Sequence, residues 1–405
     1  MVKVLYATLA LLLLSLGGSL PARQNPLAPV PPAASQEAQP PTTPLQNVPP
    51  ETPAPENAVP AAPVPDNPPP VSDPGVVTPK PPLAIPVPIE PPSNGVAAKE
   101  PIEELWRDPG DVRSRNLFYG AGGQKHEPHG SFTFIEEDME GTNPKFVVTD
   151  QDGVKWKVKT GTEAQPETAA ARLLWAAGYY TSEDYYVPEI HVLNMPAKLK
   201  RGKEYVEPGG VVRGVRMKRA LPGEKKLGLW KWTDNPFTGT RQMNGLRVMM
   251  AVMNNWDLKD INNSVYMVKN PGGDLPPKVY MVSDLGASFG TTGFNPSHKI
   301  SKGNLDSYKD SKFVDSSTAQ DVSFNVPTRP ALIVALNPKE FASRLPMRSI
   351  GQHIPIEDVR WIAQILHQLS VEQIRDAFRA AGYDKELVDG FANVVARRIA
   401  QLEQF

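Results

Sequence analysis

The stretch MNNWDLKDINNSVY occupies residues 253–266. It places Asp257, Lys259 and Asn262 between an apolar segment and a short β-branched run. Polar residues at such a position either turn the chain after a helix or form a loop that carries chemistry. The sequence on both sides of the stretch discriminates between a plain turn and a catalytic loop.

The flanking segments have the periodicities of regular structure. Residues 245–255, GLRVMMAVMNN, predict an apolar helix that leads directly into the stretch. Residues 264–268 and 278–284 predict two strands, separated by the Gly- and Pro-rich turn KNPGGDLPP. The following sequence VSDLGASFG then places Asp284 and Gly286 at the end of the second strand.

The preceding part of the chain is rich in predicted strands. Alternating residues predict strands over 131–137, 145–150, 154–160, 185–193 and 211–219, and Asp152-Gly153 suits a tight hairpin turn. A helix is predicted over 165–178, with Pro166 in its first turn and Gly178 at its exit. Lys159 therefore ends the third strand, and Glu167 opens the helix that follows it.

The rest of the chain is predicted to be mainly helical. Helices are expected over 356–369, over a segment that Ser370 and Gln373 cap and Gly382 closes, and over about 385–403. Residues 291–330 show little periodicity and predict a long loop. A β-rich front half followed by a helix-rich back half indicates an α+β, two-lobed fold.

The order of these residues matches what phosphoryl transfer from ATP requires. A lysine that a helical glutamate positions contacts the phosphates, one carboxylate orients the attacking hydroxyl, and an Asn and a second carboxylate hold magnesium. With D-L-K-x-x-N at 257–262 and Asp-Leu-Gly at 284–286, the chain resembles the protein-kinase-like superfamily. It is more similar to the atypical branches (HipA-type, phosphoinositide and secretory-pathway kinases) than to eukaryotic protein kinases.

The resemblance implies a small β-rich N-lobe, a larger helical C-lobe and a role for each matched residue. Asp257 would be the catalytic carboxylate, Lys259 would neutralise the transferring phosphate, and Asn262 and Asp284 would bind Mg²⁺, with Mn²⁺ as the alternative metal. Lys159 would contact the α/β-phosphates of ATP and pair with Glu167. The turn residues Gly141, Thr142 and Asn143 would cover the phosphates.

The pattern also departs from eukaryotic protein kinases. The chain has no G-x-G-x-x-G, Trp256 precedes Asp257 where a His-Arg pair is usual, and no A-P-E follows the Asp-Leu-Gly. These departures leave the acceptor open, either a protein or a small-molecule hydroxyl. They also leave open a catalytically inactive binding module of the same fold, a reading that the scarcity of ATP outside most cytoplasms supports.

Plainer or competing interpretations exist for the same residues. Asp257 and Asn262 also suit a cap after the preceding helix. Lys159 also suits a solvated position at a strand end, and Lys157 on the same strand face is its rival as the phosphate-binding lysine. Glu167 also suits the N-terminus of a helix on electrostatic grounds alone. G-x-S-x-G at 286–290 suggests a serine hydrolase that uses Ser288. His126 and His129 in HEPH suggest a metal site.

The N-terminal region differs from the rest in composition. An apolar run, Val4 to Leu16, is shorter than a bilayer-spanning helix, so residues 1–22 predict a cleaved signal peptide, with an uncleaved membrane anchor as the alternative. Residues 21–92 hold 26 of the 45 prolines and no aromatic residue, so 23–95 predict a disordered linker.

These observations set the organisation and location that we expect. The signal sequence predicts an exported protein, periplasmic or secreted, that meets a membrane only if its apolar run is retained. The folded part is expected to divide into a β-rich N-lobe at 96–220 and a helical C-lobe at 221–405. Absence of cysteine excludes disulfides, and a formal net charge of −1 gives no support for nucleic-acid binding.

Overall fold

The computed structural model describes residues 101–141, 143–267, 277–292, 301–326, 342, 344 and 346–405. All of them belong to the compact unit Glu90–Phe405. The predicted signal peptide or anchor and the predicted Pro-rich linker lie outside the described residues, and both stay predictions. No helix within the described ranges is long and apolar enough to cross a bilayer.

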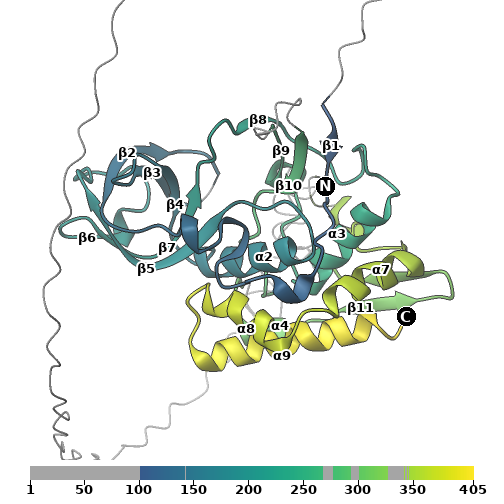
Figure 1. Cartoon of the computed structure of the whole chain (residues 1–405). Coiled ribbons are helices and arrows are strands. Elements are labelled where there is room, and N and C mark those ends of the chain that lie inside the picture. The colour runs from purple at the N-terminus through teal and green to yellow at the C-terminus, as the bar shows by residue number, and fades with distance from the viewer. Residues whose placement is uncertain are drawn as a thin grey trace, which may run out of the picture. The chain divides into compact units, whose positions relative to one another are not determined.

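A six-stranded sheet forms the β-rich half, in the order β4-β3-β2-β5-β7-β6. An additional pairing of β4 with β7 closes this sheet on itself, so that it surrounds its own apolar core (Figure 1). Val158, Trp156 and Val215 are buried in this core, as the alternation of the strands predicts. The strands are β2 (Phe132–Asp138), β3 (Lys145–Thr149), β4 (Lys155–Lys159), β5 (Asp184–Leu193), β6 (Val206–Glu207) and β7 (Val211–Arg219).

The hairpin between β3 and β4 depends on one buried carboxylate. Asp150 accepts hydrogen bonds from the backbone N–H groups of Asp152 and Val154 at 3.0 and 2.9 Å, and from the Trp156 indole at 2.8 Å. Gly153 has a φ of +77°, a conformation that residues with a Cβ adopt at a cost. The hairpin fixes the register of β4 and therefore the position of Lys159 at its end.

Replacing Asp150 by alanine is expected to lower the free energy of unfolding by about 2–3 kcal/mol, because three donors lose a charged acceptor. Urea denaturation of the wild type and the variant measures this loss. Replacing Asp152, whose carboxylate is exposed, by alanine is the control and should cost less than about 0.5 kcal/mol. Equal losses in the two variants would contradict the role of Asp150.

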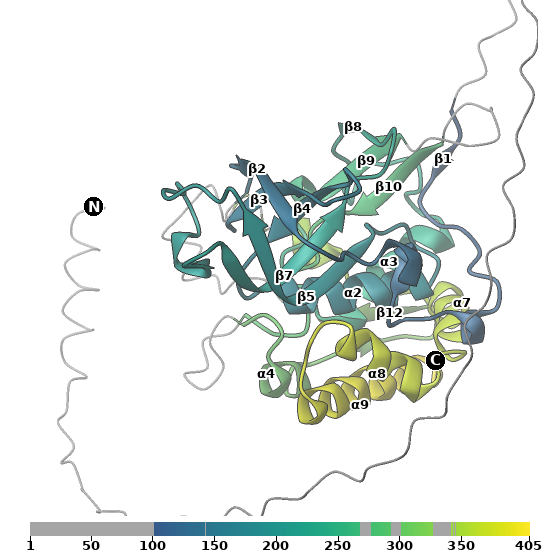
Figure 2. The same ribbon diagram turned by 60° about the vertical axis from the view of Figure 1, so that its left-hand side comes forward.

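The helices build a second and larger apolar core. Helix α2 follows β4 and contributes Leu173 and Leu174 to this core. Ser370 and Gln373 form the predicted capping box at the start of α8. Figure 2 shows α4, α8 and α9 on one side of α2 and the strands β8 to β10 on the other. The helices are α2 (Ala164–Ala176), α3 (Arg241–Val252), α4 (Leu305–Lys309), α7 (Ile356–Leu366), α8 (Val371–Arg379) and α9 (Lys385–Leu402).

A second sheet positions the polar loops. Its order is β1-β10-β9-β8, and β9 and β10 are antiparallel. Their register pairs Asn263 with Val282, so the residues just before β9 lie beside those just after β10. This brings Asn262 next to Asp284. The strands are β1 (Glu103–Glu104), β8 (Lys225–Gly228), β9 (Asn263–Met267) and β10 (Lys278–Val282).

The expectation of a long loop over 291–330 is wrong for the described part of that segment. It contains α4 and two strands of a three-stranded sheet, β11 (Val314–Ser317) and β12 (Asp321–Phe324), which continues through β13 (Ile354–Pro355). Elements of four or five residues are too short to show a clear periodicity. β7 has the predicted bounds, the other predicted strands and helices are present with shifted ends, and the fold is mixed α and β. The boundary at 220/221 stays a prediction.

Candidate functional site

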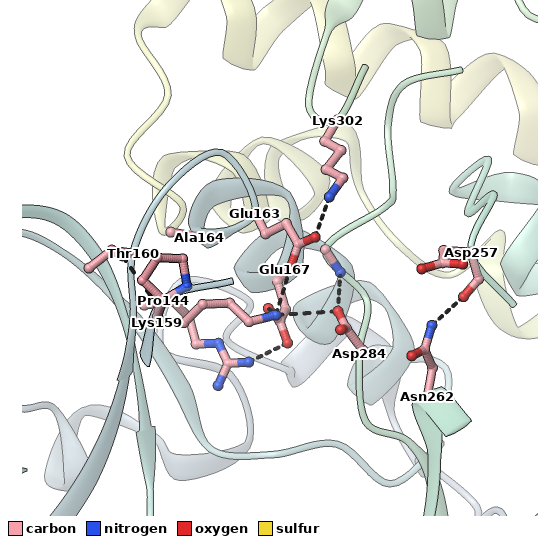
Figure 3. A network of polar contacts seen from close by, with 12 residues as sticks. Pro144, Lys159, Thr160, Glu163, Ala164, Glu167, Asp257, Asn262, Asp284 and Lys302 are labelled. Carbon is pink, nitrogen blue, oxygen red and sulfur yellow. Dashed lines mark hydrogen bonds and ion pairs between the residues drawn. The ribbon is translucent and has the colours of Figure 1, made fainter. Parts of the chain in front are cut away.

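Lys159 lies at the centre of a cluster of carboxylates, as Figure 3 shows. Its Nζ is 2.7 Å from Glu167 Oε2, 2.9 Å from Glu163 Oε2 and 3.3 Å from Asp284 Oδ1. Lys159 ends β4, both glutamates come from the start of α2, and Asp284 follows β10. The predicted pairing of Lys159 with Glu167 is therefore present, and Asp284 reaches the same ammonium across 125 positions of sequence.

The rival lysine does not reach this cluster. Lys157 pairs with Asp138 at 2.7 Å, and its side chain is 42% exposed, whereas that of Lys159 is 4% exposed. The two lysines are two residues apart on one strand, so their side chains point to the same face, and the alternation of the strand does not distinguish between them. Only Lys159 lies opposite the first turn of α2.

The cluster continues into the sheet through Arg216. Arg216 on β7 is the register partner of Lys159 on β4, and its guanidinium binds the second oxygen of Glu167. It also lies 3.5 Å from Asp184 Oδ1. Glu167 thus bridges two cations. Its side chain and those of Arg216 and Asp184 are no more than 6% exposed, whereas Asp284 is 39% exposed. Asp284 is therefore the carboxylate of this cluster that is open to a ligand.

The charges of the cluster shift one another's pKa values. Burial alone would lower the pKa of Lys159, but Glu167 and Asp284 outweigh it and hold that pKa above its ordinary value. Burial would raise the pKa of Glu163, but Lys159 and Lys302 lower it to about 2. Lys302 follows the Asp-Leu-Gly loop, and its ammonium binds Glu163 Oε1. At neutral pH, Lys159 is therefore charged and Glu163 ionised.

The stretch that contains Asp257 is a loop held by hydrogen bonds. Asp257 Oδ1 is 3.0 Å from Arg344 Nη2 and 3.4 Å from Lys259 Nζ. The backbone N–H of Asp257 donates to Asn255 Oδ1 at 3.0 Å. Asp257 is three-quarters buried, and its carboxylate faces two cations. A simple helix cap would bind backbone N–H groups with its carboxylate, which is not the arrangement seen here.

Asn262 links Asp257 to Asp284. Its amide nitrogen donates to the backbone oxygen of Asp257 at 2.5 Å (Figure 3). Its own backbone oxygen accepts from the N–H of Asp284 at 3.3 Å. The two loops are joined again further along, where the N–H of Trp256 donates to the oxygen of Ala287 at 3.3 Å. The two predicted acids therefore belong to one hydrogen-bonded assembly.

Oxygen ligands for a divalent cation are present at this assembly. Asp284 offers an exposed carboxylate, and the amide nitrogen of Asn262 is engaged, which leaves its amide oxygen as a ligand atom. Carboxylate, amide and phosphate oxygens are the ligands that Mg²⁺ and Mn²⁺ accept, and Mg²⁺ commonly takes only one or two of them from the protein. The donor set fits such a cation. Glu163, Glu167 and Asp284 also have oxygens within 4.8 Å of one another, around Lys159.

The predicted phosphate-covering turn lies between β2 and β3. Gly141 has a φ of +64°, and Arg201 Nη1 donates to its backbone oxygen at 2.6 Å. The oxygen of Pro144 accepts from the backbone and hydroxyl of Thr160, which ties the turn to the residue after Lys159. Asn143 is half-buried, and Thr142 lies outside the described residues. The turn is adjacent to the cluster, and its contact with phosphate stays a prediction.

The competing sites are not favoured. Ser288 is fully buried and its hydroxyl has no partner among the described residues, whereas a hydrolytic serine must be accessible on its turn. His298, a histidine downstream of Ser288 that could have served as its partner, lies outside the described residues. His126 instead pairs with Glu183, and His129 lies beside Asp152 on the surface, so the two histidines do not share a ligand site.

Four charged residues of the cluster and its loops belong to none of the sequence motifs. A charged residue within an alternating strand suggests a solvent-facing side chain, so the sequence gives no sign that Arg216 is buried. Glu163 precedes Glu167 by one helical turn, a spacing that places both on one face and that could have identified it. Lys302 and Arg344 lie outside any motif and are brought in by long-range folding. The four residues are Glu163, Arg216, Lys302 and Arg344.

Comparisons with known proteins identify similar structures. No protein-family model matches the chain, and no curated protein matches it. The crystal structure of the Helicobacter pylori proinflammatory kinase CtkA is similar with a TM-score of 0.37 and 11% identity, over 68% of this chain and 98% of that one. The Golgi casein kinase with Mn/ADP bound is similar with a TM-score of 0.30 and 13% identity, over 69% and 73% of the two chains. A second structure of the Golgi casein kinase gives 0.31 and 12%, over 72% and 75%.

Proposed function

We propose that this protein is an exported, ATP-dependent phosphotransferase with a two-lobed, kinase-like fold of an atypical branch. The observation that carries the proposal is the convergence of Glu167 and Asp284 on the ammonium of Lys159. The hydrogen-bonded link from Asp284 through Asn262 to Asp257 supports it. Together these residues supply the parts that phosphoryl transfer needs. The acceptor is a hydroxyl group of a protein or of a small molecule.

Each group has a task that its surroundings suit. Glu163 and Glu167 keep the Lys159 ammonium charged and fixed at the end of β4, where it binds phosphate oxygens. Asp284 and Asn262 would hold Mg²⁺, which neutralises charge on the phosphates when bound. Asp257 orients the acceptor hydroxyl and accepts its proton, and Lys259 offsets negative charge beside it.

One contact favours a second candidate, a nucleotide-binding module without turnover. Arg344 donates to Asp257 Oδ1 at 3.0 Å, so a guanidinium engages the carboxylate that would accept the proton of the acceptor. The guanidinium occupies an oxygen that the acceptor hydroxyl would need to reach. The enzyme and the module share nucleotide binding and differ in turnover alone.

Titration of the full chain with ATP and Mg²⁺ is expected to raise its melting temperature, because a ligand that binds only the folded state stabilises it. In Asp284→Asn, the part of this shift that depends on Mg²⁺ should disappear. Differential scanning fluorimetry with and without EDTA measures both effects. Asp306→Asn, which alters an exposed residue of α4, is the control. An Asp284→Asn protein that retains the magnesium-dependent shift would contradict the metal assignment.

A further inference from the structure

Lys145 is a second lysine next to the cluster of Lys159. It begins β3 directly after the predicted phosphate turn, and in the β3–β4 register its Cα is paired with that of Lys159. A methyl group added to Gly141 would lie 3.5 Å from Lys145 Nζ. The ammonium of Lys145 is therefore directly beside the turn, on the strand next to Lys159.

Asp138 on β2 is the register partner of Lys145, but the ammonium of Lys145 forms no ion pair among the described residues. Lys145 is half-buried, and no carboxylate among the described residues lies within ion-pair distance of it. The nearest candidates are already engaged, since Asp138 pairs with Lys157 at 2.7 Å and Asp284 with Lys159 at 3.3 Å. A half-buried cation in this situation is stabilised by any anion that can reach it.

The charges around Lys145 act on its pKa. Burial lowers the pKa of Lys145, Asp138 opposes this, and Lys159 and Lys157 lower it further. Asp284 acts in the raising direction, like Asp138, but more weakly. The net direction is downward, which is the expected result for an ammonium whose neighbours do not neutralise it.

We propose that Lys145 is a second phosphate-binding lysine, whose ammonium contacts the terminal phosphates of a nucleoside triphosphate bound beside Lys159. The proposal rests on the phosphotransferase function proposed above. Lys159 already has three carboxylates within 3.3 Å, so its charge is balanced by the protein. Lys145 offers a positive charge that no carboxylate of the described residues pairs with, and a triphosphate brings a negative charge that would pair with it.

This arrangement couples nucleotide binding to protonation. A bound phosphate favours the charged form of Lys145 and therefore raises a pKa that is lowered in the free protein. Between these two pKa values, binding takes up a proton, and the affinity for the nucleotide falls as the pH rises through the lowered pKa. Arginine at this position stays protonated at all relevant pH values and removes the uptake.

Isothermal titration calorimetry of the full chain with MgATP and with adenosine tests the proposal. Lys145→Met should weaken MgATP binding roughly tenfold or more, the scale of one lost charge-assisted hydrogen bond, and leave adenosine binding unchanged. Lys145→Arg should bind MgATP within a few-fold of the wild type. Lys155→Met, which removes an exposed lysine of β4, should behave as the wild type.

The same titrations at alkaline pH, in buffers of different ionisation enthalpy, measure proton uptake. Uptake by the wild type and its absence in Lys145→Arg support the proposal even where Lys145→Met fails to fold. A wild type that binds MgATP without uptake, or a folded Lys145→Met that binds it equally well, overturns the assignment of Lys145 alone. A wild type that does not bind MgATP overturns the proposed function itself.

Discussion

Replacing Asp257 by alanine is expected to reduce phosphate transfer by about 10²–10⁴-fold, the usual contribution of a positioned general base. Nucleotide binding should persist, because the link between the two loops does not use the Asp257 side chain. Asn262 donates to the backbone oxygen of Asp257, and its own backbone oxygen accepts from Asp284. Hydrolysis of ATP without an acceptor, and transfer of labelled phosphate to the protein itself, measure turnover.

Two further variants make this result specific. Asp257→Asn keeps the shape of the side chain next to Arg344 and should lose turnover to the same degree without leaving a cavity. Asp260 lies in the same loop, and its carboxylate accepts from the N–H of Trp232 at 3.1 Å. Asp260→Ala should cost about 1 kcal/mol of stability and leave turnover unchanged. Wild-type turnover in Asp257→Ala would contradict the catalytic assignment.

Turnover in the wild type also separates the two candidate functions. The binding module predicts that the wild type and Asp257→Ala bind MgATP equally and that neither transfers phosphate. Replacing Arg344 by glutamine removes the guanidinium that engages Asp257. If this contact keeps the Asp257 carboxylate from the acceptor hydroxyl, turnover should rise in the variant. If Arg344 only supports the loop, turnover should fall together with stability.

Local features of the sequence were sufficient to predict most of the elements. The run VVRGVRMKR at 211–219 predicts a strand with the bounds that β7 has, since alternating apolar residues leave few other structures. The Asp152-Gly153 turn fixes the hairpin next to it. These signals are contained within a few residues, so they do not depend on the rest of the fold. The short strands β11 and β12 were missed because four residues contain too little pattern.

The charged cluster could be predicted only in part. The motif and the order of elements place Lys159, Glu167 and Asp284 together, because the spacing of the motif fixes where each lies in its element. Arg216 could not be found in this way, because its burial results from the β4–β7 pairing and from α2, which covers that face of the sheet. The pairing of residues 159 and 216 joins distant parts of the chain, so no local sequence pattern predicts it.

Replacing Arg216 is expected to cause the second large effect, a loss of stability. Arg216→Met should lower the free energy of unfolding by about 3–5 kcal/mol, because Glu167 and Asp184 lose a cation in a site closed to water. Arg213 lies on the same strand and pairs with Glu189 and Glu207, but its side chain is 59% exposed. Arg213→Met should therefore lower the free energy of unfolding far less than Arg216→Met. Urea denaturation at neutral pH compares the two variants.

The contact between Arg216 and Glu167 also predicts the loss of unfolding free energy in a double variant. Arg216→Met leaves Glu167 with Lys159 alone, and Glu167→Gln leaves Arg216 with Asp184 alone. Most of each single loss is the cost of an uncompensated buried charge, so Arg216→Met combined with Glu167→Gln should cost clearly less than the two single losses together. Strict additivity would mean that the two side chains do not act as one unit. In that case Glu167 would pair with Lys159 independently of Arg216, and Arg216 would contribute nothing to holding the ammonium of Lys159 in place.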